Sequence, residues 1–246
     1  MTIGIIGFSR FGQLLAKILK PFGQVYVYNR SDKKELCDEI GVTWTNLEQV
    51  CQSDWVFVAV AISATEEMIK KIGPLLKKGS LVMDVCSVKV LPAQWLEKYI
   101  SQDNEIMATH PMFGPDSAKE STKDLQWILC PLRISDQKLN QVKDILNKLE
   151  NKIIITSPAD HDQQTAISLA FIHFIGRGLE QFGFKDQQIT SLGFKRLLQV
   201  NETVTNDSWQ LFVDMQIFNP YTEKIREDFI KALKQVNNKI NKKQGE

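Results

Sequence analysis

Two short segments carry the residue types that acid–base chemistry needs. Asp84–Lys89 contains a serine and a lysine, and Thr109–Pro115 contains a histidine followed by proline and glycine. The ordinary pKa of histidine lies close to neutral, so His110 is the candidate general base. Ser87 would orient His110 or hydrogen-bond a substrate hydroxyl. The alternative for an isolated histidine is a hydrogen-bonded structural role.

A corner near the N-terminus has the pattern of a dinucleotide-binding loop. It follows an apolar run, opens a helical pattern, and consists of Gly7, Phe8, Ser9, Arg10, Phe11 and Gly12. The two glycines would allow a tight turn and close packing of helix on strand, and the helix N-terminus would offer N–H groups to a diphosphate. Ser9 stands where the pattern has its middle glycine. The alternative is an ordinary strand–turn–helix corner.

The end of the second apolar run indicates which dinucleotide would bind. An NAD site usually has an acidic residue there for the ribose 2′-hydroxyl. This chain instead has Asn29, Arg30 and Ser31. A cation and a hydroxyl suit a 2′-phosphate, which favours NADP over NAD. Asp32 argues the other way, although with Glu35 it also fits a helix cap; the remaining alternative is that Arg30 is an ordinary surface cation.

The elements that must position these residues alternate in type along the first two-thirds of the chain. The expected strands are 2–6, 24–28, 55–62, 80–85, 105–109, 126–130 and 152–156, and the expected helices are 12–20, 32–39, 64–76, 92–100 and 136–150. Several strands are continuous apolar runs, which is typical of strands covered on both faces. The alternation predicts an α/β fold with a doubly wound, mostly parallel Rossmann-type sheet.

After about residue 157 helical periodicity replaces the strand pattern. The clearest helices are Trp209–Phe218 and a final one introduced by Asn219 and Pro220. We therefore expect a dinucleotide-binding domain at 1–156 and a smaller, all-helical domain at 157–246. A helical domain of that size has a thin core, so we expect it to bind the substrate and to form a homodimer.

Composition excludes several classes of protein. Lys and Arg number 30 and Asp and Glu 29, a balance that gives no support to nucleic-acid or membrane-surface binding. No apolar run approaches the roughly 18 residues of a membrane helix, and the N-terminus does not read as a signal peptide. The four cysteines and three histidines lack metal-ligand spacing. We expect a cytoplasmic protein with reduced thiols and no metal.

The paired segments also resemble a known family. Asp84–Lys89 and Thr109–Pro115 are similar to the central motifs of the prephenate/arogenate dehydrogenases of tyrosine biosynthesis. Three later segments continue the similarity along nearly the whole chain and are most similar to the plant-type arogenate dehydrogenases: His161–Asp162, His173–Gly183 and Asn206–Phe212.

The resemblance implies an oxidative decarboxylation. His110 would accept the proton of a ring hydroxyl while hydride leaves the same carbon for the nicotinamide, and loss of CO2 would then make the ring aromatic. Lys89 would lie near the cofactor or the substrate; the alternative is a solvated surface lysine. Two other readings stay open: another two-domain β-hydroxyacid-type or imine-reducing dehydrogenase, and a non-enzymatic NADP-binding sensor.

The resemblance also points to substrate-binding residues in the helical domain. Arg177 is the candidate for a substrate carboxylate, because a planar guanidinium suits that group, and His173 is a candidate contact. Asp207 resembles the acidic residue by which plant-type enzymes select arogenate over prephenate; its alternative is a helix N-cap. The chain departs from family patterns at Gln199, where many bacterial enzymes have arginine, and at Leu169, where plant-type enzymes have glutamine.

Overall fold

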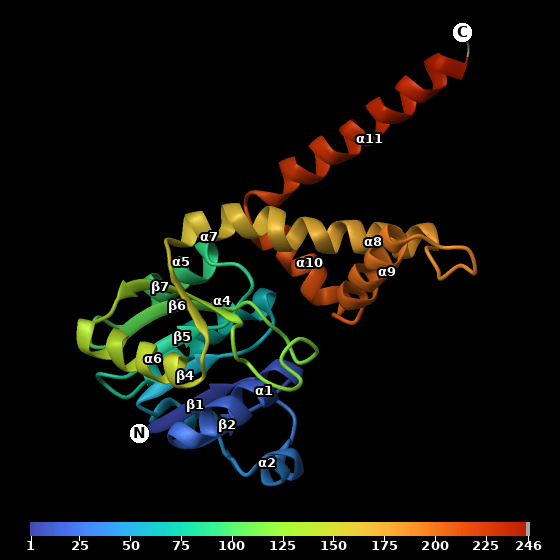
Figure 1. Ribbon diagram of the computed structural model, residues 1–246. Helices are drawn as coiled ribbons and strands as arrows, with labels where there is room; N and C mark the ends of the chain where they lie inside the picture. The colour runs from blue at the N-terminus through green and yellow to red at the C-terminus, as the bar shows by residue number, and fades with distance from the viewer. Residues whose placement is uncertain (245–246) are drawn as a thin grey trace. The chain divides into compact units, whose positions relative to one another are not determined.

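The structure is a computed structural model that describes residues 1–244 of the chain. The chain forms two compact units, Met1–His161 and Asp162 onward, and Figure 1 shows a sheet in the first and helices in the second. The boundary between the units falls inside a helix, a few residues after the sequence-based boundary at 156/157.

The first unit contains an eight-stranded sheet with the order β3-β2-β1-β4-β5-β6-β7-β8. Neighbouring strands are parallel except for the antiparallel pair β6 and β7. The predicted doubly wound, mostly parallel sheet is therefore confirmed. The strands are β1 Thr2–Ile6, β2 Gln24–Tyr28, β3 Thr43–Trp44, β4 Trp55–Val58, β5 Leu81–Asp84, β6 Glu105–Pro111, β7 Gln126–Arg133 and β8 Lys152–Ile155.

The middle of this sheet is covered on both faces. All residues of β4 and β5 are buried, which explains why these strands are continuous apolar runs rather than alternating ones. Helices connect the parallel strands, and α1 shows how they pack: Leu15, Ala16 and Leu19 of one helical face lie in the core. The helices are α1 Arg10–Leu19, α2 Lys34–Ile40, α3 Leu47–Cys51, α4 Ile62–Ile72, α5 Val90–Tyr99 and α6 Asp136–Lys148, with 3₁₀ turns at Lys20–Phe22 and Gly73–Leu75.

The order of the strands determines where a ligand can bind. The chain runs from β1 outward to β2 and β3, and then returns to the other side of β1 to form β4. This reversal between β1 and β4 is the topological switch point at which open α/β sheets bind ligands, beyond the carboxyl ends of the strands. The glycine corner follows β1, and His110 lies near the end of β6. Both therefore belong to the ligand-binding edge.

The second unit is helical. It begins within α7 (Pro158–Thr165), which continues through a π-helical segment (Ala166–Phe171) into α8 (Ile172–Phe182); three helices follow, α9 Leu192–Thr205, α10 Trp209–Phe218 and α11 Thr222–Gln244. Helices α8 and α9 pack closely, because Gly176 has no side chain: a Cβ there would lie 2.0 Å from Cγ2 of Val204. None of the helices in residues 1–244 is both long and apolar enough to cross a bilayer.

Candidate active site

Both glycines of the corner after β1 are required by close backbone contacts. Gly7 has φ +103°, and its N–H donates to Tyr28 O at 2.8 Å. A Cβ on Gly7 would lie 2.3 Å from Ala59 O, and a Cβ on Gly12 would lie 2.1 Å from Gly7 O. Any side chain at either position would push α1 or β4 away from β1. The predicted tight turn and close helix approach are both present.

The start of α1 is open to a ligand. Ser9 is the N-cap residue, yet its side chain makes no capping hydrogen bond. The first N–H groups of a helix have no partner within the helix, and they carry the positive end of its dipole. Ser9 and Arg10 are exposed beside them, whereas Phe8 is buried. This arrangement fits the diphosphate of a dinucleotide, held by the helix N-terminus.

Asn29 connects the glycine corner to the end of β2. Its side-chain Oδ1 accepts from Phe8 N at 3.1 Å, and its Nδ2 donates to Ser31 O at 3.1 Å and Ser31 Oγ at 2.9 Å. Arg30 and Ser31 are exposed beside it. Asp32 accepts from Lys34 N at 2.8 Å, but the N-cap of α2 is Lys33, so Asp32 is not the helix cap that the sequence suggested. No carboxylate occupies the Asn29 position.

Arg10 has a partner that sequence reasoning did not find. Its guanidinium lies 2.6 Å from Asp116, which belongs to the loop between β6 and β7. Both side chains are about half exposed, so the pair is accessible to water. The contact brings the β6–β7 loop to the glycine corner. This loop leaves β6 at the ligand-binding edge, because β7 is antiparallel to β6 and starts at the same edge.

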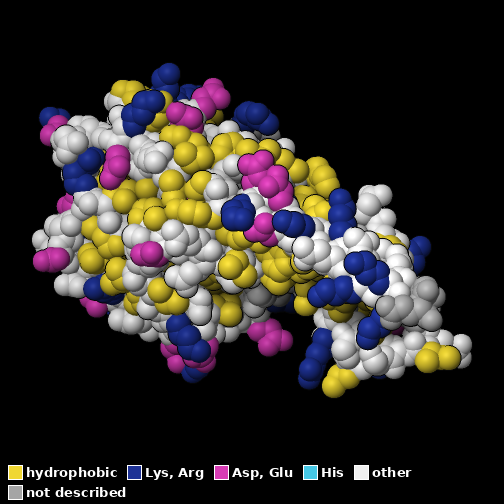
Figure 2. Space-filling model, turned by 90° about the horizontal axis from the view of Figure 1, so that it is seen from above, with side chains coloured by type: hydrophobic (Ala, Val, Ile, Leu, Met, Phe, Trp, Pro, Cys, Tyr) yellow, Lys and Arg dark blue, Asp and Glu magenta, His cyan; other side chains and the backbone are white. Residues whose placement is uncertain are grey.

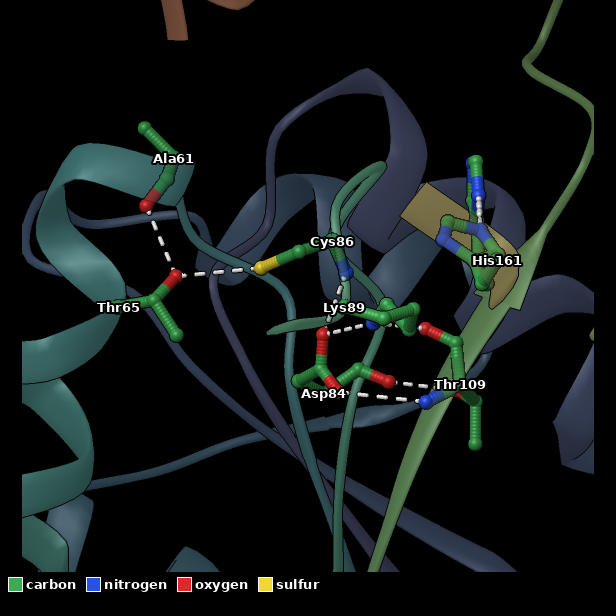
Figure 3. Close-up of polar contacts among 8 residues, drawn as sticks. Ala61, Thr65, Asp84, Cys86, Lys89, Thr109 and His161 are labelled. Carbon is green, nitrogen blue, oxygen red and sulfur yellow. Dashed lines mark hydrogen bonds and ion pairs between the residues drawn. The ribbon is translucent and has the colours of Figure 1, made fainter. Parts of the chain in front are cut away.

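A buried ionic network joins the carboxyl ends of β5 and β6 (Figure 3). The ammonium of Lys89 contacts Asp84 Oδ2 and donates to Thr109 O at 2.5 Å. The other Asp84 oxygen accepts from Thr109 N at 3.2 Å, and Thr109 Oγ1 donates to Asp84 O at 2.5 Å. Both Lys89 and Asp84 are completely buried. The network therefore fixes the backbone on which the next residue, His110, stands.

This network changes the interpretation of Lys89. The sequence suggested a lysine near cofactor or substrate, or a solvated one. The solvated alternative is wrong, since the side chain has 0% exposure and pairs with Asp84. The place of Lys89 near cofactor or substrate stays a prediction. A buried lysine needs such a partner, because an unpaired buried charge is very costly. Lys89 is a structural cation that holds β5 and β6 together at the site.

His110 contacts a second histidine. Its Nδ1 lies 2.9 Å from Nε2 of His161 in α7, and both rings are buried. Burial, His161 and the nearby Lys89 ammonium, in that order, hold the pKa of His110 well below its usual value. The imidazole is therefore neutral at pH 7, which is the form that can accept a proton. Ser87 lies half-buried after β5, and in the described part of the chain it makes no hydrogen bond to His110.

Cys86 lies on the opposite side of the same network and is not a nucleophile. Its thiol lies 3.4 Å from Thr65 Oγ1, and Thr65 in turn donates to Ala61 O at 3.0 Å (Figure 3). Burial and the Asp84 charge raise the pKa of Cys86 to about 12. The thiol is therefore protonated at neutral pH, and it packs as a small apolar side chain.

The second unit brings together the three substrate-binding candidates of the helical domain. His173 and Arg177 lie one turn apart on α8, and Asp207 follows α9. The Arg177 guanidinium donates to Asp207 O, pairs with Glu180 at 2.8 Å and lies over the Trp209 ring. His173 Nε2 lies 3.8 Å from Asp207 Oδ2. The N-cap of α10 is Ser208 and not Asp207, because Ser208 Oγ accepts from Leu211 N at 3.1 Å.

This second cluster contains buried polar atoms without hydrogen bonds. Within residues 1–244 they include His173 Nδ1, Arg177 Nε and Oδ1 of Asn201 on α9. Burial and the Arg177 charge lower the pKa of His173 to about 4, so its contact with Asp207 is not an ion pair at neutral pH. Buried polar atoms are nearly always paired in folded proteins. Their presence on facing helices is the property expected of a surface that receives a polar ligand.

The fold and the glycine corner define a dinucleotide-binding protein of the Rossmann type. No group of three or more His, Cys, Asp or Glu suited to a metal occurs among the described residues. Comparison with known families then gives a narrower assignment. Residues 15–155 match the family model "Prephenate dehydrogenase, nucleotide-binding domain", and residues 178–246 match "TYRAAT1-like, C-terminal domain". The chain belongs to the prephenate dehydrogenase family.

Curated relatives agree with this assignment. Arogenate dehydrogenase 2, chloroplastic, from Arabidopsis thaliana is 32% identical over 230 residues, covering 89% of this chain and 64% of the relative. A probable arogenate/prephenate dehydrogenase from Methanocaldococcus jannaschii is 28% identical, covering 100% of this chain and 58% of the relative. The chain thus spans less than two-thirds of the length of these relatives.

Solved structures confirm the fold. Synechocystis arogenate dehydrogenase superposes with a TM-score of 0.73 at 22% identity, covering 99% of this chain and 93% of that one. Prephenate dehydrogenase from A. aeolicus, in complex with hydroxyphenyl propionate and NAD+, superposes with a TM-score of 0.80 at 20% identity, covering 100% and 92%. At identities this low, the similarity to these structures shows a shared fold and no more.

Proposed function

We propose that the chain catalyses the NADP-dependent oxidative decarboxylation of arogenate to tyrosine. The observation that carries the proposal is the neutral imidazole of His110 at the carboxyl end of β6, on the sheet edge that also holds the glycine corner. Strands β1 and β6 are separated by β4 and β5, so the two features lie about 14 Å apart at ordinary strand spacing. An extended dinucleotide bound at the corner can reach across that distance.

The residues of this chain perform two tasks in such a reaction. The corner and the N-terminus of α1 bind the diphosphate and orient the cofactor, which supplies the hydride acceptor when bound. His110 accepts the proton of the ring hydroxyl while the ring carbon that bears this hydroxyl is oxidised. Ser87, which follows β5 at the same edge of the sheet, would hydrogen-bond the same hydroxyl. Loss of CO2 gives an aromatic ring, so the protein mainly needs to orient the substrate and remove one proton.

The preference for NADP is supported by the environment of Asn29. Its amide is occupied by Phe8 N and Ser31, so no carboxylate opposes a 2′-phosphate there. Arg30 and Ser31 are exposed and available to that phosphate. Both cofactors occur among the related proteins. The Saccharomyces cerevisiae relative is named as an NADP(+) prephenate dehydrogenase, and the A. aeolicus structure contains NAD+.

The preference for arogenate is supported by the second unit. Arogenate carries an amino group where prephenate has a keto group, and a carboxylate distinguishes the two. The Asp207 side chain is about one-third exposed, and its backbone is held by Arg177. Arg177 and His173 offer donors for the substrate carboxylates. Prephenate is the second candidate substrate, since relatives bear both names.

We also propose that the chain forms a homodimer through its helical unit. Large hydrophobic side chains are exposed along these helices. They include Ile217 on α10 and Leu233, Val236 and Ile240 on α11. Figure 2 shows one face of the molecule, on which hydrophobic and charged side chains are both exposed. A cytoplasmic location is part of the same proposal, although the plant relatives are named chloroplastic.

A four-way steady-state assay tests the function. The purified chain is given arogenate or prephenate with NADP or NAD, and reduced cofactor is measured at 340 nm. The expected result is the highest kcat/KM for arogenate with NADP, and a loss of about 10²–10⁴-fold in kcat for His110→Asn, as for removal of a general base. Cofactor binding without turnover would instead identify a sensor. Equal turnover by His110→Asn would show that His110 is not the base.

A further inference from the structure

The contact between His110 and His161 limits where the protons of the two rings can be. The atoms are Nδ1 of His110 and Nε2 of His161, 2.9 Å apart, and the rings meet edge-on with their planes at 67°. A hydrogen bond at that distance requires one N–H between the two nitrogens. Because His110 is neutral and both rings are buried, this bond contains a single hydrogen, which belongs to one nitrogen or the other.

The two possible arrangements give His110 opposite chemistry. If Nδ1 of His110 holds the proton, its Nε2 has a free lone pair and can accept a proton from a substrate. If Nε2 of His161 holds the proton, His110 must carry its own proton on Nε2, where it can only donate. The partner of His110 therefore decides whether His110 is a base.

The start of α7 fixes the backbone position of His161. His161 lies in the first turns of α7, and its N–H donates to Ser157 O at 3.0 Å. Ser157 Oγ accepts from Asp160 N at 3.1 Å and donates to Asp160 Oδ2 at 2.7 Å, so the start of the helix is capped. On the other side, the Asp84–Lys89 network fixes the strand that carries His110.

We propose that His161 is a positioning residue: its Nε2 accepts the Nδ1–H of His110 and so holds His110 in the tautomer that can act as a base. This inference rests on the proposed function, because the role of His110 as a base is what selects between the two arrangements. The tautomer can nevertheless be measured without turnover. When His110 takes up a second proton on Nε2, the Nδ1–H bond to His161 strengthens, because a charged donor makes a stronger hydrogen bond.

The low pKa of His110 has a consequence for pH dependence. Burial, His161 from α7 and the Lys89 ammonium after β5 all lower it. Each of these causes disfavours the imidazolium form of His110. His110 therefore stays available as a base in mildly acidic solution, and a carboxylate in place of His161 would remove that property.

The first test reads the tautomer directly in the unaltered chain. The sequence has only three histidines, His110, His161 and His173, so long-range ¹H–¹⁵N correlation spectra of the imidazoles are simple to assign with His173→Phe and His161→Phe. We expect His110 to show a protonated Nδ1 and an unprotonated Nε2 at pH 7. A protonated Nε2 on His110 would overturn the inference whether or not the chain turns over arogenate.

The second test uses turnover. His161→Phe keeps an aromatic ring without an acceptor, and we expect kcat to fall by about 10²-fold with KM little changed, at the lower end of what a general base contributes. His161→Asp should move the acid limb of the kcat/KM profile to higher pH, since a carboxylate favours the imidazolium. The matched control is Gln163→Ala, an exposed side chain on the same helix, which should change neither quantity.

The outcomes separate the two claims. Unchanged kcat in His161→Phe, or an acid limb that does not move in His161→Asp, would overturn the role of His161. If His110→Asn retains full turnover, the general-base assignment fails while the tautomer measurement still stands. Thermal unfolding of each variant shows whether it has folded, and the spectra of the unaltered chain decide the tautomer even if a variant has not.

Discussion

The two polar clusters of this molecule differ in how completely their hydrogen bonds are made. In the first unit, Asp84, Lys89 and Thr109 satisfy one another, and His110 bonds to His161. In the second unit, the side chains of His173 and Arg177 are 8% and 9% exposed, and each keeps one buried nitrogen without a hydrogen bond. The hydrogen bonds of the first cluster are complete, whereas the second keeps unpaired buried polar atoms, which is why we propose it as the substrate-binding surface.

The largest expected effect on stability comes from breaking the Asp84–Lys89 pair in the first cluster. Lys89→Met removes the cation and leaves the Asp84 carboxylate buried without its charge partner. We expect a loss of about 3–5 kcal/mol in the free energy of unfolding of the first unit. Urea unfolding followed by tryptophan fluorescence measures it, because four of the five tryptophans, Trp44, Trp55, Trp95 and Trp127, lie in that unit.

The matched control for Lys89→Met is Lys78→Met. Lys78 also pairs with an aspartate, Asp103 at 3.0 Å, but its side chain is 86% exposed. The unfolding midpoint of Lys78→Met should stay close to that of the unaltered chain, since exposed pairs contribute little. Equal destabilisation of the two variants would contradict the distinction between a buried and a surface pair.

A smaller effect on stability, confined to acid pH, should come from His173 in the second cluster. The pKa of His173 is about 4 in the folded chain, below the 6.5 of an unperturbed histidine. Between these values the unfolded chain binds the proton and the folded chain does not, so stability falls as pH drops from about 6.5 towards 4. The whole difference corresponds to about 3 kcal/mol. His173→Phe should flatten this part of the curve.

The measurement is urea unfolding by circular dichroism from pH 7 to pH 4. His110 also has a lowered pKa and contributes to the same pH range. The contribution of His173 is therefore the difference between the pH–stability curves of the unaltered chain and His173→Phe. The charged groups at the His173 ring include Arg177 on the same helix and Asp207, whose Oδ2 lies 3.8 Å from His173 Nε2. A curve of identical slope for the two chains would show that His173 titrates normally in the fold.

The smallest effect should come from the ion pair at the glycine corner. Arg10 and Asp116 lie 2.6 Å apart, but both are about half exposed. Asp116→Asn should change the free energy of unfolding by less than about 1 kcal/mol, because water screens the pair. The sodium chloride dependence of the unfolding midpoint in the unaltered chain and in Asp116→Asn checks this. A large loss would mean that the pair holds the β6–β7 loop.

Local patterns allowed much of the fold to be predicted. Strands β1 and β2 and helix α10 have the bounds that the sequence indicated, because each combines a clear period with turn or capping residues at its ends. The short elements β3 and α3 were missed, since two and five residues carry too little periodicity. The predicted run 55–62 was too long: the apolar residues after Val58 belong to the turn and the start of α4.

The site was predictable only where a residue type implies its environment. Gly7 and Gly12 are such residues, because backbone contact excludes a side chain. The burial of Lys89 was not predicted, since lysine is rarely fully buried and nothing near it in sequence indicates the pairing with Asp84. The partnership of His110 with His161 spans 51 positions and depends on where α7 begins after the last strand. Only the folded chain brings those two rings together.

The contact of Gly176 with Val204 sets a limit on how this helical unit can change. The missing side chain determines the distance between α8 and α9, and therefore between His173 or Arg177 and the segment that carries Asp207. A methyl group at 176 would widen that distance and shift every donor relative to its neighbours. Attempts to redesign ligand choice should therefore exchange side chains around a fixed helix spacing and leave residue 176 untouched.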